Sequence, residues 1–558
     1  MKNYINTLFA AGLILTGFSG CNLFDMEDYL DNPVAVSPEN AEVSLVMNSA
    51  QLEFESMNAN VSRITSPYVR LEAMSGGTRY QTQRSPSGFD GLYTNVYSNL
   101  LPDLDLVITQ SDEGGFTFTA GAARVLKAYA LYTMVDLFGD LPYSESGAGI
   151  ETPSPALDSD ESIYAAADAI LEQAIADLTD PVGSFGTDLY YGGDAGSWLD
   201  LANTIKLRRA VQTKLVNSDA AGTINAILAG GNFIDEISED FQWQYGTNNA
   251  APDARHPQYS DDYMAAAGGY MSNYYMWLFF GEKNVVDPRL RYYFYRQDCD
   301  ETDEDAFTLD CATAPYPAHW PNGYPFCTAS GDFGDPSGFY GGYWGRDHGN
   351  ADGIPPDASK RTVWGVYPVG GKFDADDCGS VQNNGVDGGR GAGIQPILLS
   401  SWTHFLLAEA ALTIDGVEGD PLEYLLTGVR QSIEKVMSFS SSVAPVDGDF
   451  APDEDAIEAY VTAVTNLYNN AADDDERLNV IIKEFFLALH GQGLDAFNAY
   501  RRTGKPENMQ PTEEPNPGVF PRSFWYPSNL VNRNQNVMQK TDLAGTVFWD
   551  TNPAGFIN

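Results

Sequence analysis

Positive charge is scarce in this sequence. Its 558 residues include 31 Lys and Arg against 77 Asp and Glu, which gives a formal net charge of −46. A body this acidic repels phosphate backbones and anionic membrane surfaces. We therefore expect no nucleic-acid partner, and a strongly anionic ligand only where a local basic patch or a bound cation holds it.

Long apolar runs are also rare. After the N-terminal region, no run approaches the roughly 20 apolar residues that span a bilayer. Hydrophobic residues still make up 43% of the chain, which is enough for a substantial core. The composition therefore predicts a soluble body after the N-terminal region.

Catalytic signatures are missing. The sequence contains no H-E-x-x-H, no G-x-S-x-G, no phosphate-binding loop ending in Gly-Lys-Ser/Thr and no pair of C-x-x-C units. Its five His are scattered, without an i,i+4 pair. We expect a protein that is not an enzyme. Acid pairs suited to glycoside hydrolysis stay open, but 77 acids supply close pairs by chance.

Cysteine is rare as well, with five residues in all. Cys21 lies near the N-terminus, and Cys299, Cys311, Cys327 and Cys378 lie in the central third. The four central cysteines are an even number, which predicts two disulfides if the chain is exported. Four cysteines can pair in three ways. One of them joins Cys299 to Cys311 and Cys327 to Cys378. Free buried thiols are the alternative.

The N-terminus has the pattern of an exported protein. Lys2 precedes an apolar stretch at 8–15, and Phe18-Ser19-Gly20 stands directly before Cys21. A charged region, an apolar region and small residues in this order form a secretory signal. A Cys after small residues resembles a bacterial lipobox, which implies that residues 1–20 are removed and that Cys21 receives lipid. An ordinary signal peptide with an incidental Cys is the alternative.

Beyond the signal, the chain divides into segments of different pattern. Residues 21–37 form a lipidated flexible tether, and its Asp25, Glu27 and Asp28 resemble the acidic signal for transfer to the outer leaflet. Residues 38–240 and 397–558 have helical periodicity, the latter ending in a Pro- and Asn-rich surface tail. Residues 241–396 are rich in Gly, Pro, aromatics and Asp, which is typical of long, functional loops.

The helical spacing predicts a mostly α fold. The apolar positions suit stacked antiparallel helix pairs, as in tetratricopeptide-type arrays. Pro102 should kink or break the second helix. Helices are expected at 38–57, 89–109, 119–138, 162–178, 198–216, 398–412, 456–468, 477–490 and 494–502.

Six motifs then follow one another along the chain. They are GAARVLKAYALYTMVDLFGDLPYS at 121–144, YYGGDAGSWLDLANTIKLRR at 190–209, VDPRL at 286–290, LAEAA at 407–411, a stretch at 484–506 that ends in YRRTGKP, and the tail elements FPR, YP and NRNQN between 520 and 536. In this order, behind a lipobox, they resemble the SusD/RagB family of nutrient-binding outer-membrane lipoproteins, in particular its SusD-like branch.

The resemblance implies a helical body of tetratricopeptide-like pairs with a loop-rich, Gly- and aromatic-rich segment packed against it. It implies a location at the cell outer membrane, lipid-anchored and facing the exterior. It also implies a partner, a SusC-like TonB-dependent transporter, on which the lipoprotein sits as a lid. Cargo in the family is usually an oligosaccharide and sometimes a peptide. Only Asp287-Pro288-Arg289 matches the family in the central segment, so the glycan is not named.

Aromatic residues on Gly- and Pro-rich stretches are the candidate ligand site. Sugars offer C–H faces to flat rings, and hydroxyls to amides, carboxylates or guanidinium groups. The alternative is that these rings form a small core that holds the loops together. We expect two or three of them to line the site. The candidates are Trp320, Tyr324, Tyr340, Tyr343, Trp344, Asp347 and Trp364, with Arg79 and Tyr80 in an earlier loop.

Acidic residues also gather at 298–305. Asp298, Asp300, Asp303 and Asp305 could bind calcium, which takes six to eight oxygens. The spacing lacks the Gly turn and the distal Glu of an EF-hand loop, and a solvated acidic loop is the alternative. We expect no other cofactor.

Together these features predict a binding protein that captures oligo- or polysaccharide at the cell surface for a transporter. Peptide capture is the alternative within the same fold. A surface glycoside hydrolase and a structural or adhesive protein are the alternatives from other classes.

Overall fold

The computed structural model describes residues 42–74, 77–147, 151–265, 268–299, 342–350, 359–381 and 385–557. Several predicted positions lie outside these ranges: Cys21, Asp300, Asp303, Asp305, Cys311, Trp320, Tyr324, Cys327 and Tyr340.

The described elements are α3 (Val43–Thr65), α4 (Tyr80–Gln83), η2 (Pro86–Phe89), α5 (Asp90–Thr94), η3 (Asn95–Leu100), α6 (Leu101–Gly114), α7 (Thr117–Phe138), α8 (Asp160–Thr179), α9 (Ala195–Gln212), α10 (Ala220–Gly230), η5 (Ile237–Glu239), β1 (Phe241–Gln244), α11 (Pro257–Tyr259), η6 (Ser260–Met264), α12 (Asn273–Phe280), α13 (Leu290–Tyr293), β2 (Phe294–Tyr295), β3 (Val363–Trp364), β4 (Ile394–Leu398), α15 (Ser400–Thr413), α16 (Pro421–Val443), α17 (Glu454–Asn470), α18 (Asp474–Ala488), α19 (Gly493–Thr503) and α20 (Ser528–Arg533).

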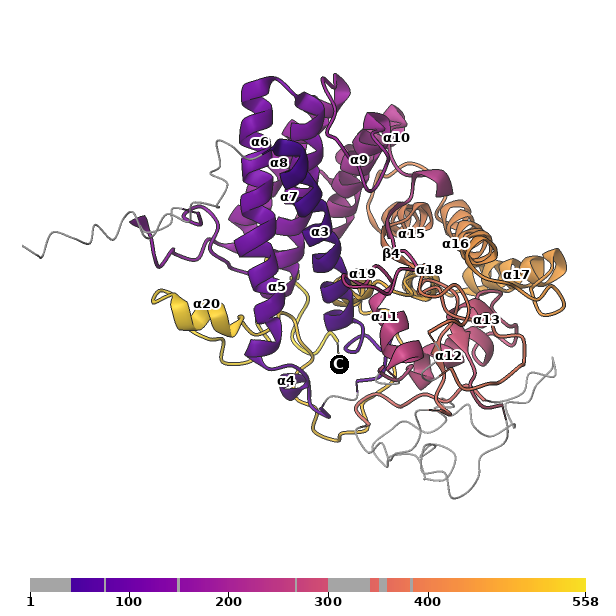
Figure 1. Ribbon diagram of the computed structural model, residues 1–558. Helices are drawn as coiled ribbons and strands as arrows, with labels where there is room; N and C mark the ends of the chain where they lie inside the picture. Colours follow the sequence, from indigo (N-terminus) through magenta and orange to yellow (C-terminus); the bar gives the residue numbers. More distant parts are fainter. Residues whose placement is uncertain are drawn as a thin grey trace, which may run out of the picture.

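The first group of helices, α3 and α5 to α9, stands side by side on one half of the molecule (Figure 1). Helix α7 lies between α6 and α8 and is buried nearly all round, as its apolar pattern predicts. Gly121 allows the close approach of α8, because a Cβ there would lie 2.8 Å from Cγ of Leu178. The prediction of a mostly helical fold built of antiparallel pairs is confirmed.

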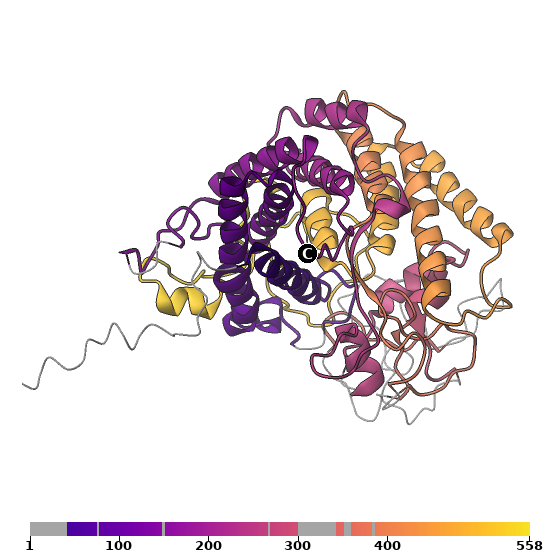
Figure 2. The same ribbon diagram turned by 45° about the horizontal axis from the view of Figure 1, so that its top comes forward.

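The second group, α15 to α18, forms the other half, and α19 lies between the groups (Figure 2). Helix α16 was not among the predicted helices, although Asp420 caps it and apolar residues recur at Leu425, Val429, Ile433 and Val436. Helices α10 and α12 were missed too, because they are short.

Helix α19 carries the Arg-Arg pair of the fifth motif and joins the two halves. Nε and Nη2 of Arg502 donate to the two carboxylate oxygens of Glu409 on α15, both at 2.7 Å. Burial alone would raise the pKa of Glu409, but Arg502 and Lys214 outweigh it and lower that pKa to about 2. Arg501 donates to the carbonyl of Asp136 at the end of α7, at 2.8 Å. The pair is therefore a structural clamp.

Pro102 does not end the second predicted helix. It lies in the first turn of α6, where the missing N–H of a proline costs little. The π-helical turn η3 stands directly before α6, so the helical path continues from α5 into α6 through a wider turn.

The loop-rich segment lies at one end of the molecule, where it contacts helices of both groups (Figure 1). Two short antiparallel pairs organise it: β1 with β4, and β2 with β3. A disulfide joins Cys299 to Cys378, whose Cα atoms lie 5.6 Å apart. The connectivity that pairs Cys299 with Cys311 and Cys327 with Cys378 is therefore wrong. The reason is that β2 and β3 bring 295–299 beside 374–378, where Arg296 also binds Asp374 at 2.7 Å.

No helix in the described part of the chain is both long and apolar enough to cross a membrane.

Candidate functional site

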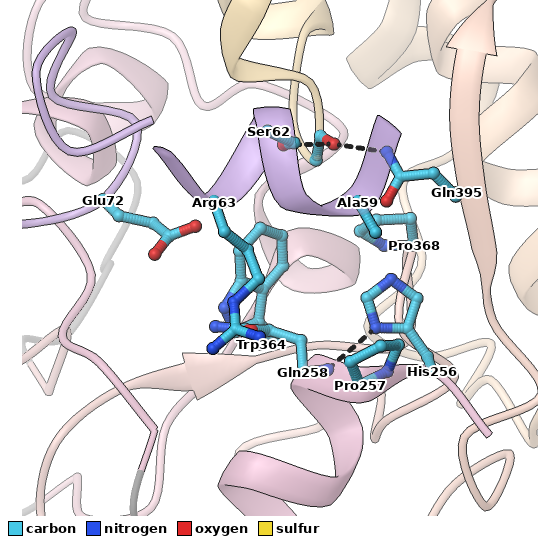
Figure 3. A pocket seen from close by; sticks show the side chains of 11 residues that line it. Ala59, Ser62, Arg63, Glu72, His256, Pro257, Gln258, Trp364, Pro368 and Gln395 are labelled. Carbon is cyan, nitrogen blue, oxygen red and sulfur yellow. Dashed lines mark hydrogen bonds between the residues drawn. The ribbon is translucent and has the colours of Figure 1, made fainter. Parts of the chain in front are cut away.

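A cleft lies where the C-terminal half of α3 meets the loop-rich segment (Figure 3). Its volume is only about 30 Å³, which holds water molecules. A larger ligand would therefore rest on its mouth. The lining residues are Ala59, Ser62, Arg63, Glu72, His256, Pro257, Gln258, Trp364, Pro368, Gln395 and Gly491.

The floor of the cleft is fixed by hydrogen bonds to one carbonyl. The Gly491 carbonyl accepts from Oγ of Ser62 at 2.8 Å and from Nε2 of Gln395 at 3.0 Å (Figure 3). Trp364 packs its ring 4.2 Å from the ring of His490 and is only 6% exposed. Four segments far apart in sequence thus form one surface: α3, β3, β4 and the turn at 490–491.

Backbone pairing places Glu72 beside Tyr270. Glu72 and Met271 form an isolated antiparallel bridge, and the Ala73 N–H donates to the Tyr270 carbonyl at 2.9 Å. Tyr270 is partly exposed, and the guanidinium of Arg346 lies 4.0 Å from its ring centroid. A second guanidinium, that of Arg361, lies 5.8 Å away. These cation–π contacts hold the ring in place.

Charged groups surround the mouth. Arg63, which is 56% exposed, pairs with Asp261 at 3.4 Å. Asp262 is buried and accepts from Arg361 at 3.0 Å and from the Trp364 N–H at 3.2 Å. The rim therefore offers both acceptors and donors of hydrogen bonds.

Glu72 is the most perturbed acid of the cleft. Burial raises its pKa to about 7; Arg63 opposes the rise, and Asp262 and Asp261 add to it. In Figure 3 its carboxyl group points toward the side chain of Arg63. Near neutral pH this carboxyl group can donate a hydrogen bond when protonated and accept one when ionised.

His256 behaves differently. Burial lowers its pKa to about 3, so the imidazole is neutral, and its Nδ1 accepts from the Gln258 N–H at 3.1 Å. The His side chain supplies shape and a ring edge to the cleft, without charge.

Among the predicted ligand residues, Trp364 lines the cleft. Arg79 is exposed and lies 3.8 Å from Glu514. Tyr80 is buried, and its hydroxyl accepts from Arg70 and bonds to His348. The structure does not bring Arg79 and Tyr80 to this cleft.

The other described candidates are buried and engaged within the protein. Tyr343 lies 4.9 Å beneath the guanidinium of Arg296. The indole N–H of Trp344 donates to the Asp298 carbonyl at 2.9 Å. Asp347 accepts from Asn273 and from Gln510. These contacts match the interpretation of a small core that holds the loops together.

The calcium hypothesis has one described residue, Asp298, and its carboxylate lies 3.1 Å from the Lys360 ammonium group. Within the ranges that the structure describes, no group of three or more His, Cys, Asp or Glu is placed to hold a metal ion. Two further acids near the disulfide, Asp374 and Asp376, pair with Arg296 and Arg291.

Sequence reasoning missed Arg63, Glu72 and Tyr270. Tyr270 follows Gly268-Gly269, the same signal of an aromatic after glycines that marked the other candidates. Nothing in the local pattern marks Glu72, because its role comes from the bridge to Met271.

Two family models match the chain. One, described as "Starch-binding associating with outer membrane", matches residues 35–308. The other, described as "Susd and RagB outer membrane lipoprotein", matches residues 395–547. Among curated proteins, none matches the chain.

Solved structures share the fold. A chitin-binding protein is 19% identical, with 92% of this chain and 100% of that chain covered and a TM-score of 0.67. A SusD homologue from Bacteroides fragilis is 17% identical, covering 91% and 99%, with a TM-score of 0.66. A chitin-binding SusD homologue from Flavobacterium johnsoniae is 18% identical, covering 92% and 99%, with a TM-score of 0.61.

Proposed function

Because this chain belongs to the SusD/RagB family, we propose that it captures glycan oligomers at the cell surface and delivers them to a SusC-like TonB-dependent transporter. The observation that carries the proposal is the match of both halves of the chain, in order, to family models whose descriptions name starch binding and the outer membrane. Support for a glycan also comes from two relatives of the same fold that are described as chitin-binding.

In this proposal the ligand rests on the mouth of the cleft. Backbone pairing places Tyr270 beside Glu72, and its partly exposed ring meets the C–H face of a sugar. Glu72 and Arg63, which line the cleft, meet the hydroxyl groups of the sugar. The predicted helical part, 38–240, supplies Glu72 and Arg63, and the loop-rich part, 241–396, supplies Tyr270 and Trp364. The ligand thus touches both parts at once.

The route to the membrane is part of the same proposal. Cys21 carries the lipid, and residues 21–37 link the anchor to the helical body. Each buried CH₂ of the lipid contributes about 0.8 kcal/mol to membrane attachment. The protein acts by binding and release, without chemical change of the cargo.

Isothermal titration with maltohexaose and chitohexaose tests the glycan proposal. We expect the wild-type protein to bind at least one of these probes, and Tyr270→Ala to weaken that binding about tenfold or more. Tyr424→Ala, which removes a partly exposed ring from the distant helix α16, is the matched control and should bind as wild type.

Three outcomes would overturn the proposal. The first is binding of peptides and of no glycan in a wider panel. The second is the appearance of shortened sugars after incubation, which would indicate a hydrolase. The third concerns the partner: purification from the membrane without a co-purifying barrel contradicts the transporter half.

A further inference from the structure

A second aromatic surface lies beside the middle of α3, about two helical turns from the cleft mouth. Arg63, Ala59 and Glu55 are spaced four residues apart, so they share one face of the helix. Arg63 is exposed and the other two are partly exposed. At a rise of 1.5 Å per residue, this row runs about 12 Å away from the mouth.

Strand β1 borders this row and connects it to the cleft. Trp243 stands directly opposite Gln395 in the register of β1 with β4, and Gln395 lines the cleft. Tyr245 follows directly after β1, and its backbone N–H donates to the Gly393 carbonyl at 2.9 Å. Its ring lies 4.8 Å from that of His256, and its hydroxyl donates to Glu55.

Two partly exposed rings end the row. The ring of Trp243 lies 5.6 Å from that of Tyr190, and the two planes are nearly perpendicular at 66°. The Tyr190 hydroxyl donates to the Gln51 carbonyl on α3 at 3.2 Å, which fixes its position. We call Trp243 and Tyr190, with Glu55 beside them, the β1 platform.

The indole of Trp243 differs from most others in the described residues. The indole N–H groups of Trp198, Trp344, Trp402, Trp525 and Trp549 each donate a hydrogen bond to another residue. The N–H of Trp243 makes none within the described residues, although its ring is only partly exposed. An indole with a fixed ring and a free donor suits a ligand that has both C–H faces and hydroxyl groups.

We propose that the β1 platform is a second sugar-binding surface, so that an oligosaccharide held at the cleft mouth continues along α3 to Trp243. This inference rests on the proposed function and specifies its ligand: a chain of several sugar units, bound in an extended form. A short oligomer reaches only the cleft mouth, and a longer one gains the contact with the indole.

The test compares chain lengths. Dissociation constants are measured by titration for the trimer and hexamer of the maltose and chitin series, with wild type, Trp243→Ala and Tyr270→Ala. For the series that wild type binds, we expect Trp243→Ala to weaken hexamer binding about tenfold and trimer binding less than twofold. Tyr270→Ala should weaken both.

Two further variants guard against loss of structure. Trp243→Phe keeps an aromatic ring but lacks the N–H donor, so its hexamer affinity should lie between those of wild type and Trp243→Ala. Phe116→Ala removes a 50% exposed ring at a remote turn and should change neither affinity. Thermal unfolding of all variants checks that they fold.

The outcomes separate the two proposals. If wild type binds no glycan, the proposed function is overturned, and the inference with it. If wild type binds and Tyr270→Ala weakens binding, but Trp243→Ala affects trimer and hexamer equally or not at all, only the β1 platform is overturned.

Discussion

The pKa values of two carboxyl groups, those of Glu409 and Glu72, shift in opposite directions in this protein. Glu409 is buried against two cations, and its pKa falls to about 2. Burial raises the pKa of Glu72 to about 7, because Arg63 offsets the burial only in part and Asp262 and Asp261 add to the rise. Glu409 is therefore an ionised group with a structural role, whereas Glu72 titrates near neutral pH at a position where a ligand could contact it.

We predict that Glu72→Gln flattens the pH dependence of stability. Between pH 4.5 and 7, Glu72 ionises in the unfolded chain but stays protonated in the folded one, so stability falls as pH rises. Solvent at the cleft mouth reduces the effect to about 1–2 kcal/mol. Urea unfolding at pH 5 and 7.5 measures it, with the exposed Glu113→Gln as control. Equal pH dependence in wild type and Glu72→Gln would contradict the prediction.

At the scale of elements, the contact of α19 with α3 positions the cleft floor. A Cβ on Gly493, at the first turn of α19, would lie 2.5 Å from the Ser66 nitrogen and 2.5 Å from Oγ1 of Thr65. Both groups belong to the end of α3, whose Ser62 binds the Gly491 carbonyl. The absence of a side chain at Gly493 therefore sets the distance between these helices.

Gly493→Ala should destabilise the protein by about 2 kcal/mol, because the added methyl group meets backbone that cannot yield. Gly91→Ala is the matched control: it lies in helix α5 with nothing within 4 Å, and it should stabilise by about 0.5–1 kcal/mol. Chemical denaturation gives both values. Similar effects of the two substitutions would show that close packing at Gly493 is unimportant.

The disulfide acts at the same scale. Cys299 and Cys378 are separated by 79 residues, and in the chain-entropy description closing such a loop stabilises by about 4 kcal/mol. We expect the double variant Cys299→Ser/Cys378→Ser to unfold at a lower temperature in calorimetry. Peptide mapping without reductant should recover the two cysteines in one fragment pair. Recovery of Cys299 joined to Cys311 would refute the pairing.

The whole molecule is dominated by its negative charge of −46. Like charges on a compact body repel one another, and unfolding relieves the repulsion. Salt shortens the range of that repulsion, from about 30 Å at 0.01 M to about 8 Å at 0.15 M. The protein should therefore be more stable at high ionic strength than in dilute buffer.

The melting temperature should rise by about 5 °C between 0.01 M and 0.5 M NaCl. Differential scanning fluorimetry measures it. KCl at equal ionic strength should give the same rise, since screening does not depend on the cation. A melting temperature that is constant or falls with salt would argue against charge repulsion as a major cost of folding.

Local patterns predicted a helix well when the residues of that helix alone determine which of its faces are buried. Helix α7 is apolar on all sides, and such a helix has to be central in any fold. Arg501 and Arg502 belong to the fifth motif, and they bind a helix-end carbonyl and a carboxylate, respectively. Helix α16 was not predicted, although Asp420 caps it and its apolar residues recur at helical spacing.

The candidate site was less predictable, because its residues are joined only by long-range pairing. Tyr343 and Trp344 resemble Tyr270 in their Gly-rich surroundings, yet they are buried and Tyr270 is partly exposed. Which ring faces solvent depends on the bridge of Glu72 with Met271 and on the pairing of β2 with β3.

By itself, then, the sequence determined a helical fold and the family to which the chain belongs, since these depend on spacing and motifs within single segments. Only the tertiary structure decided the partner of Cys299, the perturbed carboxyl of Glu72 and the aromatic rings beside α3. Each of these depends on which distant segments come into contact. The burial and the nearby charges at such a contact come from residues far away in the sequence, so a local pattern cannot predict them.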